Sequence, residues 1–410
     1  MSNAVTRTIV NPHSPTMSPV ANHLLQFYIA ETMRLTVPST YARTEMCRFL
    51  VPMALQQPSL LYAIMAFAAV HLDAIGGLAG NAEKLIDTLQ GNSISHLRHQ
   101  LARRDPTARV VSLATTRTLC QAQIYGGKPL WRLHLNGARA ILQSSHTQNN
   151  KQGSCSCTST EEGFLLSWYN NAEGLAALTP AGLPGDQLGI SCPSSREVFF
   201  DIFGGVMSDL PDLFREVGAL VKERRRRAGP SPNRSILSES DIAVEADTLI
   251  REIHYRLQRD TAENLSLHPQ ILQALSANDI EDYALGNAAF LYTALLHVHC
   301  GVQRKPSSGP EAQFCVQNII CCAQNMKFSS GLSPRVLLVA PLFAAGLCAV
   351  GSGRESARSA LADIGSWMKT PHLSKTVTLL EQIWSQSSGE LEGDGVWTWF
   401  ERISFDFLPY

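Results

Sequence analysis

The sequence of 410 residues lacks the short motifs by which common enzyme classes are recognised. It has no Gly-x-x-x-x-Gly-Lys loop for a nucleotide phosphate, no Gly-x-Ser-x-Gly turn for a nucleophilic serine, and no His-Glu-x-x-His metal motif. The glycine-rich segment 76–80 has the wrong spacing for a phosphate loop, and no strand precedes it. These absences disfavour the enzyme classes that depend on such motifs, and we expect no cofactor.

The chain also lacks any Cys-x-x-Cys pair among its ten cysteines. A structural zinc ion needs four ligands, and the closely spaced thiols at 155–157 and 321–322 have no second pair nearby. We interpret the first as thiols in a surface loop and the second as small buried residues of a helix. The histidines at 297–299 are two residues apart, and such residues do not share a face of a helix. No metal site is therefore expected.

The sequence also has no large excess of either charge and no long apolar run. The 34 basic and 35 acidic residues nearly cancel, which disfavours a surface that follows a nucleic-acid backbone, so direct DNA contact from this chain is not expected. The longest apolar runs, 60–72 and 336–350, fall short of the ~18–20 residues that span a bilayer. The first residues contain no apolar secretory segment, so we expect an intracellular protein without a membrane contact.

Apolar residues instead recur at helical spacing along most of the chain. One very apolar helix should open at Pro58 and close at Gly76-Gly77. No period-two alternation or fixed repeat is found, so the expected fold is all-α, an irregular multi-helix array of antiparallel helices with Pro/Gly/Ser-rich loops. The other predicted helices are 22–34, 81–103, 107–125, 129–143, 161–178, 196–203, 206–227, 240–259, 280–301, 311–327, 334–349, 354–368 and 372–386.

Composition divides the chain into three parts. Residues 1–20 are polar and rich in proline, which predicts a disordered tail. Residues 21–400 are expected to form one helical unit, with a subdivision near the polar segment 145–160. Residues 401–410 form a C-terminal tail.

Five helical segments carry a resemblance to a known family. They are HLLQFYIAETM at 23–33, FLVPMALQQPSLLYAIMAFAAVHL at 49–72, HLNGARAIL at 134–142, VLLVAPLFAAGLCAV at 336–350 and HLSKTVTLLEQIW at 372–384. In this order the segments resemble the fungal-specific transcription factor domain. This family region is all-helical and usually follows a six-cysteine binuclear zinc cluster.

The resemblance implies a transcriptional regulator in the nucleus, often one that controls a specialised metabolic pathway. It would act through contacts with other transcription proteins, with a small hydrophobic ligand and a homodimer as further expectations. No cysteine precedes Cys47, so the zinc cluster is absent from this sequence. DNA binding would then come from a separate DNA-binding subunit or from a missing upstream exon.

An alternative of another class is a small-molecule-binding protein or cofactor-free enzyme, in the cytoplasm, that acts on a hydrophobic biosynthetic intermediate. Its best candidate is His134, which follows Trp131 by one helical turn and would act as a general base in an apolar pocket. Glu173 and Asp186 are the candidate carboxylate partners. The competing interpretation is a hydrogen-bonded core histidine that fixes helix packing.

Two further groups of residues are candidates for binding. The aromatic pair Trp168-Tyr169, together with Trp131, could line a small-molecule pocket or pack between helices. The basic run consists of Lys222, Arg224, Arg225, Arg226 and Arg227 and is a candidate nuclear localisation signal. Its alternative is a solvated helix C-terminus, where cations meet the negative end of the helix dipole.

Overall fold

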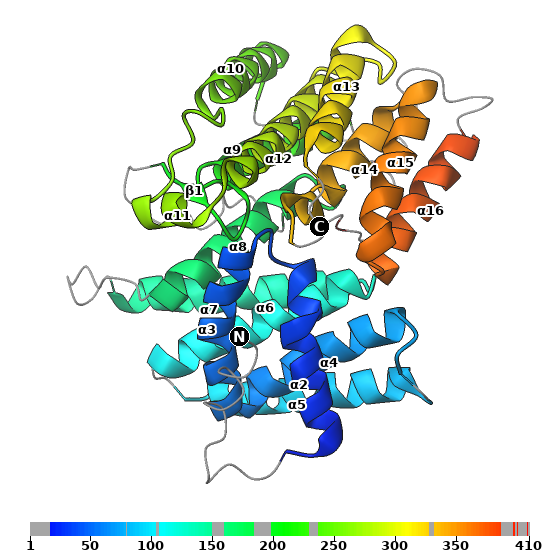
Figure 1. Cartoon of the computed structure of the whole chain (residues 1–410). Coiled ribbons are helices and arrows are strands. Elements are labelled where there is room, and N and C mark those ends of the chain that lie inside the picture. Colours follow the sequence, from blue (N-terminus) through cyan, green and yellow to red (C-terminus); the bar gives the residue numbers. More distant parts are fainter. Residues whose placement is uncertain are drawn as a thin grey trace.

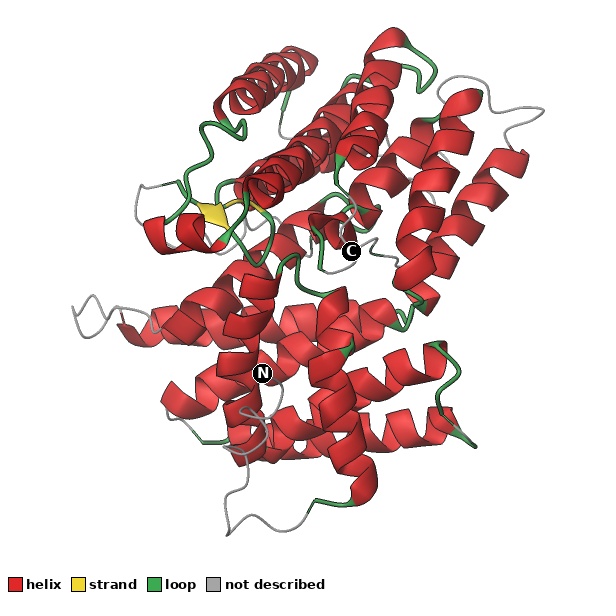
Figure 2. Ribbon diagram, viewed as in Figure 1, coloured by secondary structure: helices red, strands yellow, loops and turns green. Residues whose placement is uncertain are grey.

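A computed structural model describes residues 17–78, 80–103, 106–149, 160–183, 198–228, 237–327 and 332–386, with Trp397, Phe400 and Leu408. Helices make up nearly all regular structure in these ranges, and a single short two-stranded ribbon accompanies them (Figure 2). The all-α prediction is confirmed. Most of the two predicted tails lies outside the described residues.

The N-terminal half of the fold surrounds one apolar helix. It contains α2 (Pro19–Ala30), η1 (Thr32–Leu35), α3 (Thr40–Gln56), α4 (Pro58–Ala74), α5 (Ala82–Leu101), α6 (Pro106–Tyr125) and α7 (Trp131–Asn149). Helix α4 packs against α2, α3, α5 and α6, and its residues from Ala63 to Leu72 are all buried. Proline at its first position and the positive φ of Gly76 (73°) set its two ends, as the sequence predicts.

The C-terminal half is a second layer of helices above the first (Figure 1). It contains α9 (Leu210–Ala228), α10 (Glu239–Arg259), α11 (Pro269–Ala274), α12 (Ala277–Leu296), the π-helical η3 (His297–Val302), α13 (Pro310–Asn325), η4 (Pro334–Leu337), α14 (Val339–Cys348), α15 (Ser352–Trp367) and α16 (Pro371–Gln386). Helix α12 lies at its centre and contacts α9, α10, α13 and α14. The continuous helix Ala277–Val302 is long and apolar enough to cross a membrane, but 83% of its apolar window is buried inside the fold.

Helix α8 (Thr160–Ala177) joins the two halves, because it packs against α6 and α7 on one side and α9 on the other. A short ribbon follows it, in which β1 (Phe200–Asp201) pairs antiparallel with β2 (Val206–Met207). Hydrogen bonds from Ser167 and Asn171 to the Asp201 carboxylate tie the ribbon to the same helix.

The helix predicted over 196–203 is wrong, because β1 of the ribbon lies in this segment. The Asp201 carboxylate accepts the backbone N–H groups of Phe203 and Gly204, and these bonds stabilise a turn in place of a helix. Gly205 has a φ of +66°, which a continuing right-handed helix does not allow. The next helix consequently begins at Leu210 rather than at 206. The segment predicted as one helix over 334–349 is divided into η4 and α14, and Pro341 lies in the first turn of α14.

Helices α8 and α9 cross at a close approach that depends on glycine. A Cβ atom at Gly218 of α9 would lie 2.5 Å from the carbonyl oxygen of Ala177, and one at Gly174 of α8 would lie 3.0 Å from the Cα of Pro211. Small residues at these two positions therefore set the distance between the helices.

We expect Gly218→Ala to lower the free energy of unfolding by about 1–3 kcal/mol, because the added methyl group forces the two helices apart. Gly91 is the matched control, since it lies in α5 and an added Cβ atom would meet no other atom within 4 Å. Gly91→Ala should raise stability by about 0.5–1 kcal/mol through helix propensity. Urea unfolding followed by circular dichroism measures both, and equal effects of the two substitutions would contradict the close approach.

Candidate functional site

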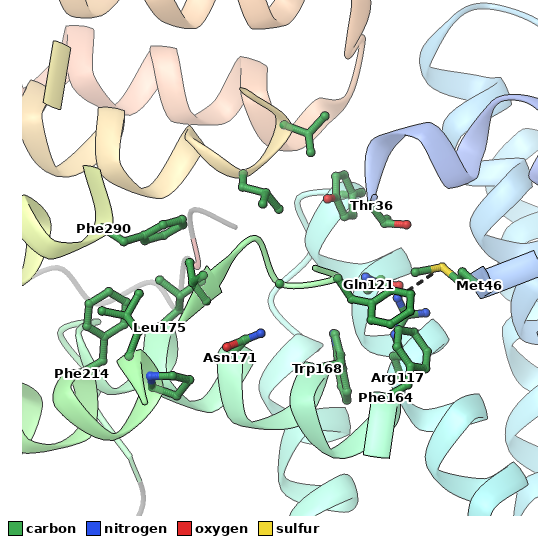
Figure 3. Close-up of a pocket in the computed structure, with 18 residues that line it drawn as sticks. Thr36, Met46, Arg117, Gln121, Phe164, Trp168, Asn171, Leu175, Phe214 and Phe290 are labelled. Carbon is green, nitrogen blue, oxygen red and sulfur yellow. Dashed lines mark hydrogen bonds between the residues drawn. The ribbon is translucent and has the colours of Figure 1, made fainter. Parts of the chain in front are cut away.

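A narrow cavity lies where the two halves meet, and three helices each present one face to it (Figure 3). Helix α6 contributes Arg117, Gln121 and Tyr125, which are four residues apart and therefore share a face. Helix α8 contributes Phe164, Trp168, Asn171 and Leu175, and α9 contributes Leu210, Pro211 and Phe214. The remaining lining residues are Thr36, Met46, Phe203, Gly204, Val206, Phe290, Val336 and Leu337.

The cavity is a slot rather than a chamber. About 50 Å³ of it is open to the centre of a water molecule, so any ligand larger than a few water molecules must widen it. Most of the surface that lines it is apolar. Figure 3 shows Arg117, Gln121 and Trp168 toward one end, and Leu175, Phe214 and Phe290 toward the other.

Arg117 brings a positive charge to the first end, although its exposed fraction is only 2%. Its guanidinium carbon lies 5.0 Å from the ring centre of Phe164 and 5.9 Å from that of Trp168, both within cation–π range. One of its nitrogens lies 3.7 Å from the sulfur of Met46. Burial raises the pKa of the neighbouring Tyr28 to about 12, and the charge of Arg117 opposes that rise.

Two polar atoms at the same end have no hydrogen-bond partner among the described residues. They are the Oε1 atom of Gln121 and the Nε1–H group of Trp168, in side chains that are 1% and 5% exposed. A buried polar group without a partner carries a desolvation cost of about 1–3 kcal/mol. Asn171, in contrast, donates to the Asp201 carboxylate at 2.9 Å, so its amide is already held by the β1–β2 turn.

A second buried polar cluster holds α7, α8 and α9 together beside the cavity. The carboxylate of Glu173 is completely buried and accepts hydrogen bonds from Arg139 at 2.6 Å, from Arg215 at 3.2 Å and from the Tyr169 hydroxyl. Burial, followed by the Glu173 charge, raises the pKa of Tyr169 above its ordinary value. None of these four residues lines the cavity. We call them the Glu173 cluster.

The model of the fungal specific transcription factor domain matches residues 23–406. The chain belongs to this family. No curated protein and no solved structure matches it. Because the match spans almost the whole helical body, the family supports a role in transcription regulation, and the family as a rule points to the nucleus.

In this family member the predicted general base and its partners do not form a pair in the described residues. His134 lies in α7, and burial lowers its pKa to about 4, so the imidazole is neutral at physiological pH. No hydrogen bond joins it to a carboxylate within the described ranges. The Glu173 oxygens accept from Arg139, Arg215 and Tyr169 instead. Asp186 lies outside the described residues.

The predicted aromatic pocket is divided between different places. Only Trp168 of the three lines the cavity between the halves. Trp131 is buried beneath the guanidinium of Arg132 at 4.4 Å and borders a separate surface hollow with His372. Tyr169 belongs to the Glu173 cluster.

The basic run lies at the C-terminal end of α9, and its arginines contact neighbouring segments. Arg224 and Arg227 both bond the Glu239 carboxylate of α10, Arg225 donates to the carbonyl oxygen of Pro180, and Arg226 pairs with Glu223. A role for the run in nuclear import remains a prediction. Among the described residues there is no group of three or more His, Cys, Asp or Glu side chains that could hold a metal ion.

Proposed function

We propose that this family member regulates transcription of a specialised metabolic pathway from the nucleus, and that a small apolar ligand in the cavity between its halves controls its contacts with other transcription proteins. DNA contact would be supplied by another module or by a separate subunit, because the sequence contains no six-cysteine cluster. The observation that carries the regulatory role is the family match over residues 23–406. The observation behind the proposed ligand is the cavity between the two halves.

The cavity lies where a bound ligand could change how the two halves are placed relative to each other. Its lining comes from α3 and α6 in the N-terminal half, from α9, α12 and η4 in the C-terminal half, and from α8 between them. A ligand that contacts both halves has a binding free energy that depends on how the halves are placed. Such a ligand shifts the population toward the placement it binds best.

Deletion of the gene tests the regulatory proposal when both transcript levels and metabolites are measured. We expect the transcripts of one set of pathway genes to fall together and the product of that pathway to disappear, with both restored by the intact gene. If the transcripts persist while a single intermediate accumulates, the regulatory proposal fails. The cofactor-free enzyme would then be the function to test, with His134→Ala as its first variant.

A further inference from the structure

The polar end of the cavity has the groups that recognise an anion. Arg117 supplies a positive charge inside a largely apolar lining, where a charge interacts more strongly than in water. The Trp168 Nε1–H group is a donor that no acceptor among the described residues satisfies. Both side chains border the same space, so one acidic group can meet a cation and an N–H donor together.

The other end of the cavity has the groups that bind a hydrocarbon. Leu175, Phe214 and Phe290 present only carbon to the slot, and α8 runs from the polar end to this end. The narrowness of the slot favours a linear chain or a flat ring over a bulky skeleton. The polar and apolar groups are therefore separated along one direction.

We propose that the ligand of this cavity is an amphipathic carboxylic acid, bound with its carboxylate between Arg117 and Trp168 and its apolar body along α8 toward Phe214 and Phe290. This inference rests on the proposed function for the role of the ligand, but not for its chemistry. Gln121 completes the head-group site, because its Oε1 atom can accept from a hydroxyl or N–H group next to the carboxylate. The acid is either a linear aliphatic one or an aromatic one.

Binding of matched probes to the purified full-length chain tests the proposal. Decanoate and 2-naphthoate represent the aliphatic and the aromatic acid, and decan-1-ol and 2-naphthalenemethanol are their neutral counterparts. We expect at least one acid to bind roughly tenfold or more tightly than its alcohol at pH 7.4, because a hydrogen bond to a charged group is stronger than one between neutral groups. Isothermal titration calorimetry measures all four affinities, and the two acids compared with each other identify the type of body.

Substitutions at Arg117, Trp168 and Arg132 test whether the preference for the acid arises in the cavity. Arg117→Met should remove the preference for the acid and leave the alcohol bound, whereas Trp168→Phe should reduce it in part. Arg132→Met is the matched control, since Arg132 also stacks on a tryptophan but lies outside the cavity. Arg117→Lys, which keeps the charge, replaces Arg117→Met if circular dichroism shows the latter to be unfolded, and should then weaken the acid more than the alcohol.

Two results would overturn the proposal. The first is that each alcohol binds as tightly as its acid, and the second is that neither acid binds the unaltered chain. Neither of these binding results would change the outcome of the deletion experiment, so the regulatory proposal would remain supported by the transcripts. Conversely, selective binding of an acid by a chain whose deletion leaves all transcripts unchanged would support this inference while contradicting the proposed function.

Discussion

Replacing Glu173 by alanine is expected to lower the free energy of unfolding by about 3–5 kcal/mol. The substitution leaves two arginines in the interior without the carboxylate that they share. The side chains of Arg139 and Arg215 are 14% and 7% exposed, so water cannot replace the lost partner at little cost. Urea unfolding at pH 7.5 measures the change.

Glu281 is the matched control, because it forms an ion pair with Lys327 in which both side chains are about half exposed. Exposed pairs contribute about 0–1 kcal/mol, so Glu281→Ala should have a small effect. A double-mutant cycle with Glu173→Leu and Arg139→Met should lose less stability than the two single changes added together, since it removes both charges of one pair. Equal costs for Glu173→Ala and Glu281→Ala would contradict the account of the Glu173 cluster as a buried link between helices.

The protein is also expected to lose several kcal/mol of stability when the pH falls from 7.5 to 5.5. Burial lowers the pKa of His71 and His372 to about 4 and that of His297 to about 3. In the unfolded chain these groups bind protons near pH 6.5, so below that pH acid favours unfolding until the folded groups also titrate near pH 4. Linkage gives about 1 kcal/mol for each histidine at pH 5.5. Carboxyl groups whose pKa burial raises, such as Asp201, act in the opposite direction.

Variants at two histidines test this window. His71 has its Nδ1 atom 3.2 Å from the Thr32 hydroxyl, and glutamine can keep a hydrogen bond there. His71→Gln should reduce the difference in unfolding free energy between pH 7.5 and pH 5.5 by about 1 kcal/mol. His254, which is exposed on α10, is the control for the substitution, and its replacement by glutamine should change the difference less than His71→Gln does. If His71→Gln changed this difference no more than His254→Gln, His71 would take up its proton in the folded protein as readily as in the unfolded chain, which would contradict the prediction.

Most of the fold could be predicted from the sequence because helical spacing of apolar residues is a local signal. The ends of α4 follow from Pro58 and Gly76, and each acts on its own turn. The failure at 196–203 has a local cause that spacing does not reveal. There the Asp201 side chain bonds the backbone two and three residues ahead, and the helix is replaced by a turn.

The site is harder to predict from the sequence than the fold, because it is assembled from faces of helices that are far apart in the chain. The aromatic character of Trp168 alone makes it a candidate, whereas the sequence analysis does not select Arg117 and Gln121. Their spacing of four residues is an available signal, since it places both on one face of α6. Which faces meet across the interior depends on tertiary packing. For the same reason, the sequence predicts Glu173 as a partner of His134, although its carboxylate accepts hydrogen bonds from arginines of α7 and α9.

Helix α8 lines the cavity with one face and carries the Glu173 cluster on another, and this shared position has a thermodynamic consequence. If occupation of the cavity makes the two halves harder to separate, then association of the halves must tighten occupation by the same factor, because coupling between two equilibria is reciprocal. A contact that stabilises this association therefore favours occupation as well. The arginines that bond Glu173 would therefore tune the sensitivity of the protein to the proposed ligand without contacting that ligand. In this protein the ligand concentration needed for a response and the stability of the association between the two halves would then depend on the same coupling free energy.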